Sequence, residues 1–377
     1  MSMSSLCRTV VMIGSLAVSS IAFADAAKPS KVLIVVSAEG RDEGKTRPGF
    51  EMDEFAQAYL IFRDNGVDVD VASPAGGAVQ ADKFNAKERF NAALLADADA
   101  VAKLAATIPT RDIDASQYAA VYVVGGKGAM FDLPFDTALK NALARVYDAG
   151  GILAAVCHGP AALVDVKLAD GSSLVKGRRL TGFTNEEEMV FGKRWAKEFK
   201  FLLEDAMRER SAQWHEAALM MPNLVVDGRL ITGQNPYSTT AVAEAVVIAT
   251  GRTPVARALW RDEATMALVQ RLLDGDARTV REQLAKNPGN FHVELIGMLG
   301  YYQLQSSSND DGVRNSLAIM QLAQPHMPEP QLALGIADAQ QRLGERVAAV
   351  ATLDSLLASH PEMDEAKQLR ARISTQP

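Results

Sequence analysis

The chain has 377 residues, of which 48% are hydrophobic and 23% are charged, and its formal net charge is −7. This length exceeds one ordinary domain, so we expect two domains, each with a hydrophobic core of its own. The negative charge and the lack of a Lys/Arg cluster argue against nucleic acid or an anionic membrane surface as a partner.

The first 24 residues are typical of a secretory signal peptide. Arg8 supplies the positive charge, residues 10–21 form an apolar run, and Ala22-Phe23-Ala24 is a small-residue cleavage site. The run is too short for a membrane span, although a retained anchor is the alternative. We expect cleavage, a periplasmic or secreted protein and no stable membrane insertion. The intact mass of the exported chain, which should begin near Asp25, tests this expectation.

The predicted signal peptide contains Cys7, so the exported chain would keep one cysteine, Cys157. A single thiol can form no internal disulfide, and in an oxidising compartment it is a chemical liability. The presence of Cys157 in an exported chain therefore favours a chemical role for this thiol.

Cys157 follows the apolar run 152–156 and precedes His158 and the helix-compatible segment 159–163. This layout is typical of a nucleophile elbow, in which a sharp turn between a strand and a helix carries the nucleophile. The unpaired N–H groups and the dipole at the start of that helix would lower the pKa of the thiol. The alternative is an inert cysteine buried at the end of a strand.

Short apolar strands alternate with segments of helical spacing through residues 25–257, which we take as the first domain. The expected strands are 31–37, 67–72, 119–124 and 152–156, with a hairpin at 223–233, and the expected helices are 51–65, 135–149 and 238–250, with one or two more between 78 and 118. The alternation predicts an α/β fold with a parallel sheet between helices. The working residues of such a sheet lie at the carboxyl ends of its strands.

Residues 258–377 show no strand pattern and are rich in Leu, Ala, Gln and Arg. Pro288, Pro325 and Pro361 each follow a helix-like segment at nearly equal spacing, which resembles a degenerate tetratricopeptide repeat. We expect an all-α helical-hairpin module that contacts a protein partner or a second copy of the chain. The alternative is a helical extension packed on the first domain.

Several segments of the first domain resemble the ThiJ/PfpI superfamily, whose fold is that of the class I glutamine amidotransferases. The matching segments are 32–37, 62–77, 125–132, 154–160, 181–183 and 230–240. The branch resembled is the stress-chaperone and glyoxalase III group. The resemblance implies a flavodoxin-like parallel sheet with a nucleophile elbow. The chain has no H-x-x-x-H pair and no standard phosphate loop, so we expect neither a metal nor a cofactor.

The family pattern implies roles for residues at two strand ends. Cys157 matches the nucleophile, and His158 matches the adjacent catalytic histidine. Gly126, Lys127 and Gly128 follow another strand, where backbone N–H groups would form an oxyanion hole. The branch usually has histidine where this chain has Lys127, which puts the identity of the substrate in question.

Two carboxylates complete the implied site. Glu54 matches the acidic residue beside the thiol, where the neighbouring negative charge would favour its protonated form. Glu188 matches the carboxylate that orients the histidine. The alternatives are Glu51 and Asp53 for the first position, and Glu186 and Glu187 for the second.

The resemblance implies an enzyme that converts a small 2-oxoaldehyde, such as methylglyoxal, to a hydroxy acid without glutathione. Deglycation or peptide hydrolysis by the same Cys-His pair is one alternative. The other is a non-enzymatic stress chaperone or a thiol redox sensor, which would act through oxidation of the cysteine.

Overall fold

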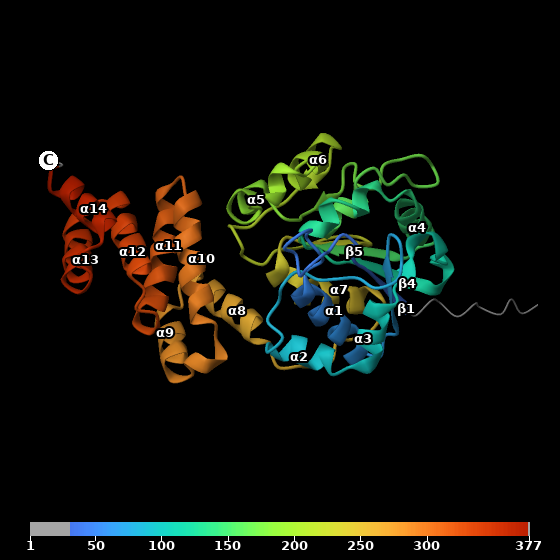
Figure 1. The fold of residues 1–377 in the computed structure, drawn as a ribbon, viewed down its shortest axis with the longest axis horizontal. Coiled ribbons are helices and arrows are strands. Elements are labelled where there is room, and N and C mark those ends of the chain that lie inside the picture. The colour runs from blue at the N-terminus through green and yellow to red at the C-terminus, as the bar shows by residue number, and fades with distance from the viewer. Residues whose placement is uncertain (1–30, 376–377) are drawn as a thin grey trace, which may run out of the picture.

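The computed structural model describes residues 31–375, in which an α/β domain is followed by a column of helices (Figure 1). The predicted signal peptide and Cys7 lie outside the described residues. Within residues 31–375, no helix combines the length and the apolar character that a membrane span requires.

A seven-stranded sheet lies at the centre of the α/β domain, in the order β3-β2-β1-β4-β5-β9-β8. All neighbouring strands pair in parallel except β8 and β9, which form an antiparallel hairpin. The inner strands are buried almost throughout because helices cover both faces of the sheet. The strands are β1 (Lys31–Val35), β2 (Val69–Ser73), β3 (Ile108–Pro109), β4 (Tyr118–Val123), β5 (Ile152–Val156), β8 (Leu224–Asp227) and β9 (Leu230–Gly233). A second, two-stranded sheet pairs β6 (Arg179–Leu180) with β7 (Gln213–Trp214).

Two hydrophobic clusters form the core of this domain, one on each face of the sheet. The first contains buried side chains of α1 (Met52–Asp64) and α7 (Thr239–Ala249), and the second contains those of α4 (Thr137–Asp148). Four shorter helices complete the domain: α2 (Arg89–Leu95), α3 (Ala98–Ala105), α5 (Asn185–Phe191) and α6 (Leu203–Glu209). The predicted parallel sheet between helices is therefore confirmed.

Two local features differ from the sequence-based expectation. The two-residue edge strand β3 is too short to leave a pattern in the sequence. The element after Cys157 is a five-residue 3-10 helix, η5 (Gly159–Leu163), and not an α-helix. Pro160 lacks an N–H group, and the Ala161 N–H donates to the carbonyl of His158 three residues earlier, at 3.0 Å. So short a helix supplies little dipole at its start.

The C-terminal part is all-helical, as predicted, and most successive helices pack on each other along the column (Figure 1). Its α-helices are α8 (Arg261–Leu273), α9 (Ala277–Lys286), α10 (Val293–Ser306), α11 (Asp310–Ala323), α12 (Pro330–Arg342), α13 (Arg346–Ser359) and α14 (Asp364–Thr375). Its repeat-like character and its predicted partner stay predictions.

The helical part is packed on the α/β domain. The ring of Trp260 meets that of Phe90 edge to face, with centroids 5.7 Å apart. The side-chain amide of Gln57 in α1 donates to Asp262 in α8 at 2.8 Å. Met221, which belongs to the α/β domain, is buried within the hydrophobic cluster of the helical part. These contacts favour the view that the helices are an extension of the first domain.

We expect Met221→Ala to lower the free energy of unfolding by about 2–4 kcal/mol, because its side chain is only 4% exposed and its loss leaves a cavity between the two parts. Urea unfolding of the full chain measures this change. Met189→Ala is the matched control, since Met189 is 81% exposed and should change stability by less than about 0.5 kcal/mol. Equal effects of the two substitutions would contradict the shared core.

Candidate active site

Cys157 lies at the carboxyl end of β5 in a left-handed backbone conformation, with φ of 60°. Residues other than glycine rarely adopt this conformation, which costs free energy and often marks a functional turn. The Cys157 N–H donates to the carbonyl of Gly233 on the neighbouring strand at 2.9 Å. The loop after β4 passes so close that a Cβ on Gly125 would lie 2.7 Å from that of Cys157. The strained elbow is thus clamped between two neighbouring strand ends.

His158 connects the thiol to a carboxylate. Its Nδ1 lies 3.4 Å from Sγ of Cys157, and its Nε2 lies 2.8 Å from Oε2 of Glu188. A proton on Nε2, donated to the carboxylate, leaves the lone pair of Nδ1 facing the thiol. The three side chains are each no more than 6% exposed. This arrangement can take the thiol proton during attack on an electrophile.

The three glutamates at 186–188 have different contacts. Glu187 forms a capping box with Thr184 at the start of α5, and its other oxygen accepts from the N–H of Met220 at 2.8 Å. Glu186 is half-buried and lines a different cavity. Glu188 alone of the three bonds to His158 in this structure.

Glu54, on α1, is fully buried on the other side of the thiol. Its Oε2 accepts from the N–H of Gly125 at 2.6 Å, while its Oε1 has no hydrogen-bond partner within residues 31–375. Burial, followed by the negative charge of Glu51, raises the pKa of Glu54 well above its usual range. The protonated acid is therefore favoured at this position.

The two alternatives for the acid beside the thiol have other surroundings. Asp53 accepts from the side-chain amide of Asn91 at 2.6 Å. Glu51 precedes α1, and burial together with the charges of Asp53 and Asp82 raises its pKa to about 8. Glu51 reaches Gly125 only through its backbone N–H, which donates to the Gly125 carbonyl at 3.2 Å, whereas the carboxyl of Glu54 hydrogen-bonds the Gly125 N–H and the Cys157 thiol.

The pKa of the Cys157 thiol is raised well above its usual range, first by burial and then by the charge of Glu54. The direction is opposite to the lowering that the sequence predicted. That expectation was wrong because the thiol is only 3% exposed and the helix that follows it is too short to supply a strong dipole. The neutral thiol is therefore the favoured form of Cys157.

The predicted oxyanion hole is corrected in part. The Gly126 N–H hydrogen-bonds the Cys157 side chain and opposes the rise of its pKa. Gly128 is excluded, because its N–H donates to the carbonyl of Gly49 at 3.0 Å. The His158 N–H has no acceptor in the described part of the chain, so it is a further candidate beside Gly126 and Lys127. The Lys127 charge lies among acidic groups and lowers the pKa of Glu51.

Aromatic rings cover the histidine, a role that the sequence did not reveal. The ring of Phe183 lies 4.4 Å from that of His158 between centroids, and the ring of Phe199 lies 6.1 Å away. These residues are far from His158 in sequence, so no spacing pattern indicates the contact. Their packing excludes water from the imidazole. Among residues 31–375 there is no cluster of three or more His, Cys, Asp and Glu side chains able to hold a metal.

The raised pKa predicts how Cys157 reacts with iodoacetamide. The thiolate is the reactive form, so the alkylation rate should be low near pH 7 and still rise at about pH 9.5. Glu54→Gln removes the carboxyl that raises the Cys157 pKa, through its charge when it ionises and through its hydrogen bond to the thiol, and should move this rise to lower pH. Asp53→Asn, on the same helix but bonded to Asn91, is the control and should leave the curve in place. A wild-type plateau below about pH 8 would show that the thiol is acidic instead.

Glu188→Gln should reduce kcat by about 100-fold or more, because an amide holds the imidazole less firmly in the tautomer that accepts the thiol proton. KM should change little, since Glu188 contacts His158. Steady-state kinetics on the substrate proposed below measures both constants. Glu186→Gln is the neighbouring control and should have the kcat of the wild type. An equal decrease of kcat in both variants would show that Glu188 does not orient His158.

Comparison with known proteins agrees with this geometry. Residues 46–249 match the DJ-1/PfpI family model. The glutathione-independent glyoxalase hsp3101 of Schizosaccharomyces pombe is 31% identical over 219 residues, covering 53% of this chain and 86% of that protein. The glutathione-independent glyoxalase HSP31 of Saccharomyces cerevisiae is 30% identical over 230 residues, covering 57% of this chain and 95% of that protein.

A solved structure shares the architecture of the α/β domain. The crystal structure of glyoxalase III from Candida albicans covers 59% of this chain and 98% of its own, with 27% identity and a TM-score of 0.51. The family match spans more than half of this chain and includes both Cys157 and Glu188. The chain belongs to the DJ-1/PfpI family.

Proposed function

We propose that this protein is a glutathione-independent glyoxalase that converts a small 2-oxoaldehyde, such as methylglyoxal, to a 2-hydroxy acid. The observation that carries the proposal is the thiol of Cys157 between a base and an acid. The imidazole of His158 lies 3.4 Å from the sulfur, and the buried carboxyl of Glu54 lies on the other side. Relatives at about 30% identity that bear this name support the reading.

The chemistry is an internal redox reaction followed by hydrolysis. The sulfur of Cys157 forms a bond with the aldehyde carbon, while the thiol proton passes to Nδ1 of His158 and the protonated carboxyl of Glu54 gives its proton to the carbonyl oxygen. This gives a hemithioacetal. The proton of the former aldehyde carbon then moves to the ketone carbon, and the hydroxyl proton of the hemithioacetal moves to the ketone oxygen, which gives a 2-hydroxy thioester. The first carbon is oxidised and the second is reduced, so the balance needs no external oxidant or cofactor.

Glu54 is suited to carry the proton between the two carbons. A carboxyl group with a raised pKa binds and releases protons closer to neutral pH than an ordinary one. The N–H groups of Gly126 and His158 are placed to stabilise negative charge on the substrate oxygen. Water then cleaves the thioester, which releases the hydroxy acid and restores the thiol.

The burial of the site favours a small substrate over a peptide. Cys157 is 3% exposed and His158 is 1% exposed, with Phe183 packed against the imidazole. A peptide backbone would have to displace this cover before it reached the sulfur, whereas a three-carbon aldehyde needs little room. The same burial argues against a freely accessible redox sensor, whose thiol must meet its oxidant.

The test is an assay of the full chain on methylglyoxal without glutathione, with lactate measured as product. We expect turnover by wild type and none above background by Cys157→Ser, because a serine hydroxyl loses its proton far less readily than a thiol and is a weak nucleophile while it is neutral. A glycated amino acid and a peptide serve as competing substrates. Equal activity of Cys157→Ser, or turnover of the peptide alone, would overturn the proposal.

We also propose that the enzyme acts after export, because residues 1–24 have the three regions of a signal peptide. A full-length mass of the protein recovered from the outer compartment would contradict cleavage.

A further inference from the structure

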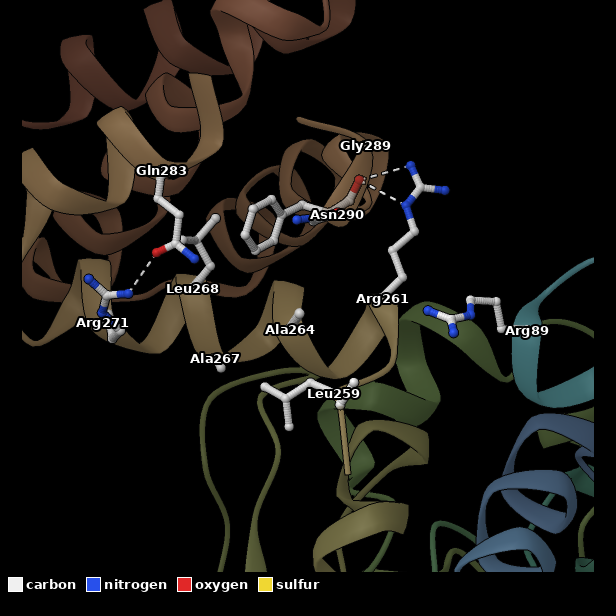
Figure 2. Close-up of a pocket in the computed structure, with 12 residues that line it drawn as sticks. Arg89, Leu259, Arg261, Ala264, Ala267, Leu268, Arg271, Gln283, Gly289 and Asn290 are labelled. Carbon is white, nitrogen blue, oxygen red and sulfur yellow. Dashed lines mark hydrogen bonds between the residues drawn. The ribbon is translucent and has the colours of Figure 1, made fainter. Parts of the chain in front are cut away.

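A second cavity lies where the helical part meets the α/β domain. Its volume is about 570 Å³, and its walls come from α2, the linker before α8, α8, α9 and the turn at Gly289 (Figure 2). Cavities that bind small molecules commonly have volumes of this order. None of the residues assigned to the active site lines this cavity, so its chemistry must be read from its own side chains.

Positive charge gathers at one end of the cavity. Arg89 reaches out from α2 toward the start of α8, where Arg261 lies (Figure 2). Within residues 31–375 neither guanidinium has a carboxylate partner. Arg261 donates twice to the carbonyl of Phe291, at 3.0 and 2.8 Å, which fixes its position without neutralising its charge. Two cations from different parts of the fold thus share one cavity.

The charge of the third arginine in the cavity wall is compensated by an aspartate. Arg271, at the far end of α8, forms an ion pair with Asp276 at 2.5 Å and donates to Gln283 at 2.8 Å. No aspartate or glutamate is among the lining residues. The uncompensated charge is therefore confined to the end formed by Arg89 and Arg261.

The middle of the cavity is apolar. Leu259, which is 50% exposed, lines the cavity together with Leu268 and Phe291. Ala264 and Ala267 on α8 have short side chains that leave the space between these walls open (Figure 2). An apolar body of a ligand would cover Leu259 and remove its surface from water.

We propose that this cavity binds a small organic anion, with a carboxylate or phosphate group held by Arg89 and Arg261 and an apolar body along α8. A guanidinium matches either anion through two parallel hydrogen bonds, and a bound anion removes the repulsion between the two cations. The hydroxy acid product of the proposed reaction lacks the apolar body. The site therefore serves a different ligand and goes beyond the proposed function.

The test is isothermal titration calorimetry of the full chain with octanoate and with phenyl phosphate, which distinguish the two headgroups. Octanol, which has the chain without the charge, and inorganic phosphate, which has the charge without the body, are the comparison ligands. Arg89→Gln removes a guanidinium that has no partner to lose. Ala267→Trp fills the cavity from an exposed position on α8. Arg278→Gln, at an arginine that is 91% exposed on α9, is the matched control.

We expect octanoate or phenyl phosphate to bind with saturation and both comparison ligands to bind at least tenfold more weakly. Arg89→Gln and Ala267→Trp should each weaken binding by about tenfold or more, while Arg278→Gln should leave it unchanged. Thermal melting of each variant verifies that it is folded. Equal binding of inorganic phosphate, equal binding by Ala267→Trp, or no saturation below about 1 mM would overturn the proposal.

Discussion

A buried carboxyl group, that of Glu54, is the constraint around which the active site is arranged. It forms hydrogen bonds with the N–H of Gly125 and with the thiol of Cys157, and its Oε1 is left without a partner in the described residues. A charge with so little compensation is costly in a buried position, so the proton is retained. The carboxyl holds together α1, the loop after β4 and the elbow, and the absence of a Cβ at Gly125 allows these segments to approach.

On the opposite side of the thiol, His158 contacts a carboxylate of α5, a helix that is distant from α1 in the sequence. Glu187 caps this helix and accepts from the backbone of Met220, and the next residue, Glu188, bonds to His158. Met220 packs against the hydrophobic cluster of the helical part. Glu188, which bonds to His158, is therefore connected to the interface between the two parts of the fold through its neighbour Glu187 and through Met220.

The helical part contacts the other side of the site as well. Gln57, one turn after Glu54 on α1, bonds to Asp262 at the start of α8. Arg261, the residue before Asp262, faces the arginine-lined cavity. The same end of α8 thus contacts α1 through Asp262 and lines the cavity through Arg261. The helices are part of the architecture that supports the site, and they are not merely tethered to it.

The sequence by itself determined those features that depend on near neighbours in the chain. Alternating apolar strands and helices predicted the α/β sheet, the Asp227-Gly228 turn predicted the β8–β9 hairpin, and the strand-Cys157-His158 order predicted the elbow. Each depends on backbone preference and on which face of a local element is apolar, and both can be read from short spacing.

Only the tertiary structure decided what depends on distant neighbours. It selected Glu188 from three adjacent glutamates, removed Gly128 from the oxyanion hole and reversed the expected direction of the Cys157 pKa. A pKa follows from the amount of water that packing excludes and from charges brought near by the fold. Likewise, an N–H is available only if no distant carbonyl takes it. Neither burial nor a long-range partner is a property of spacing along the chain.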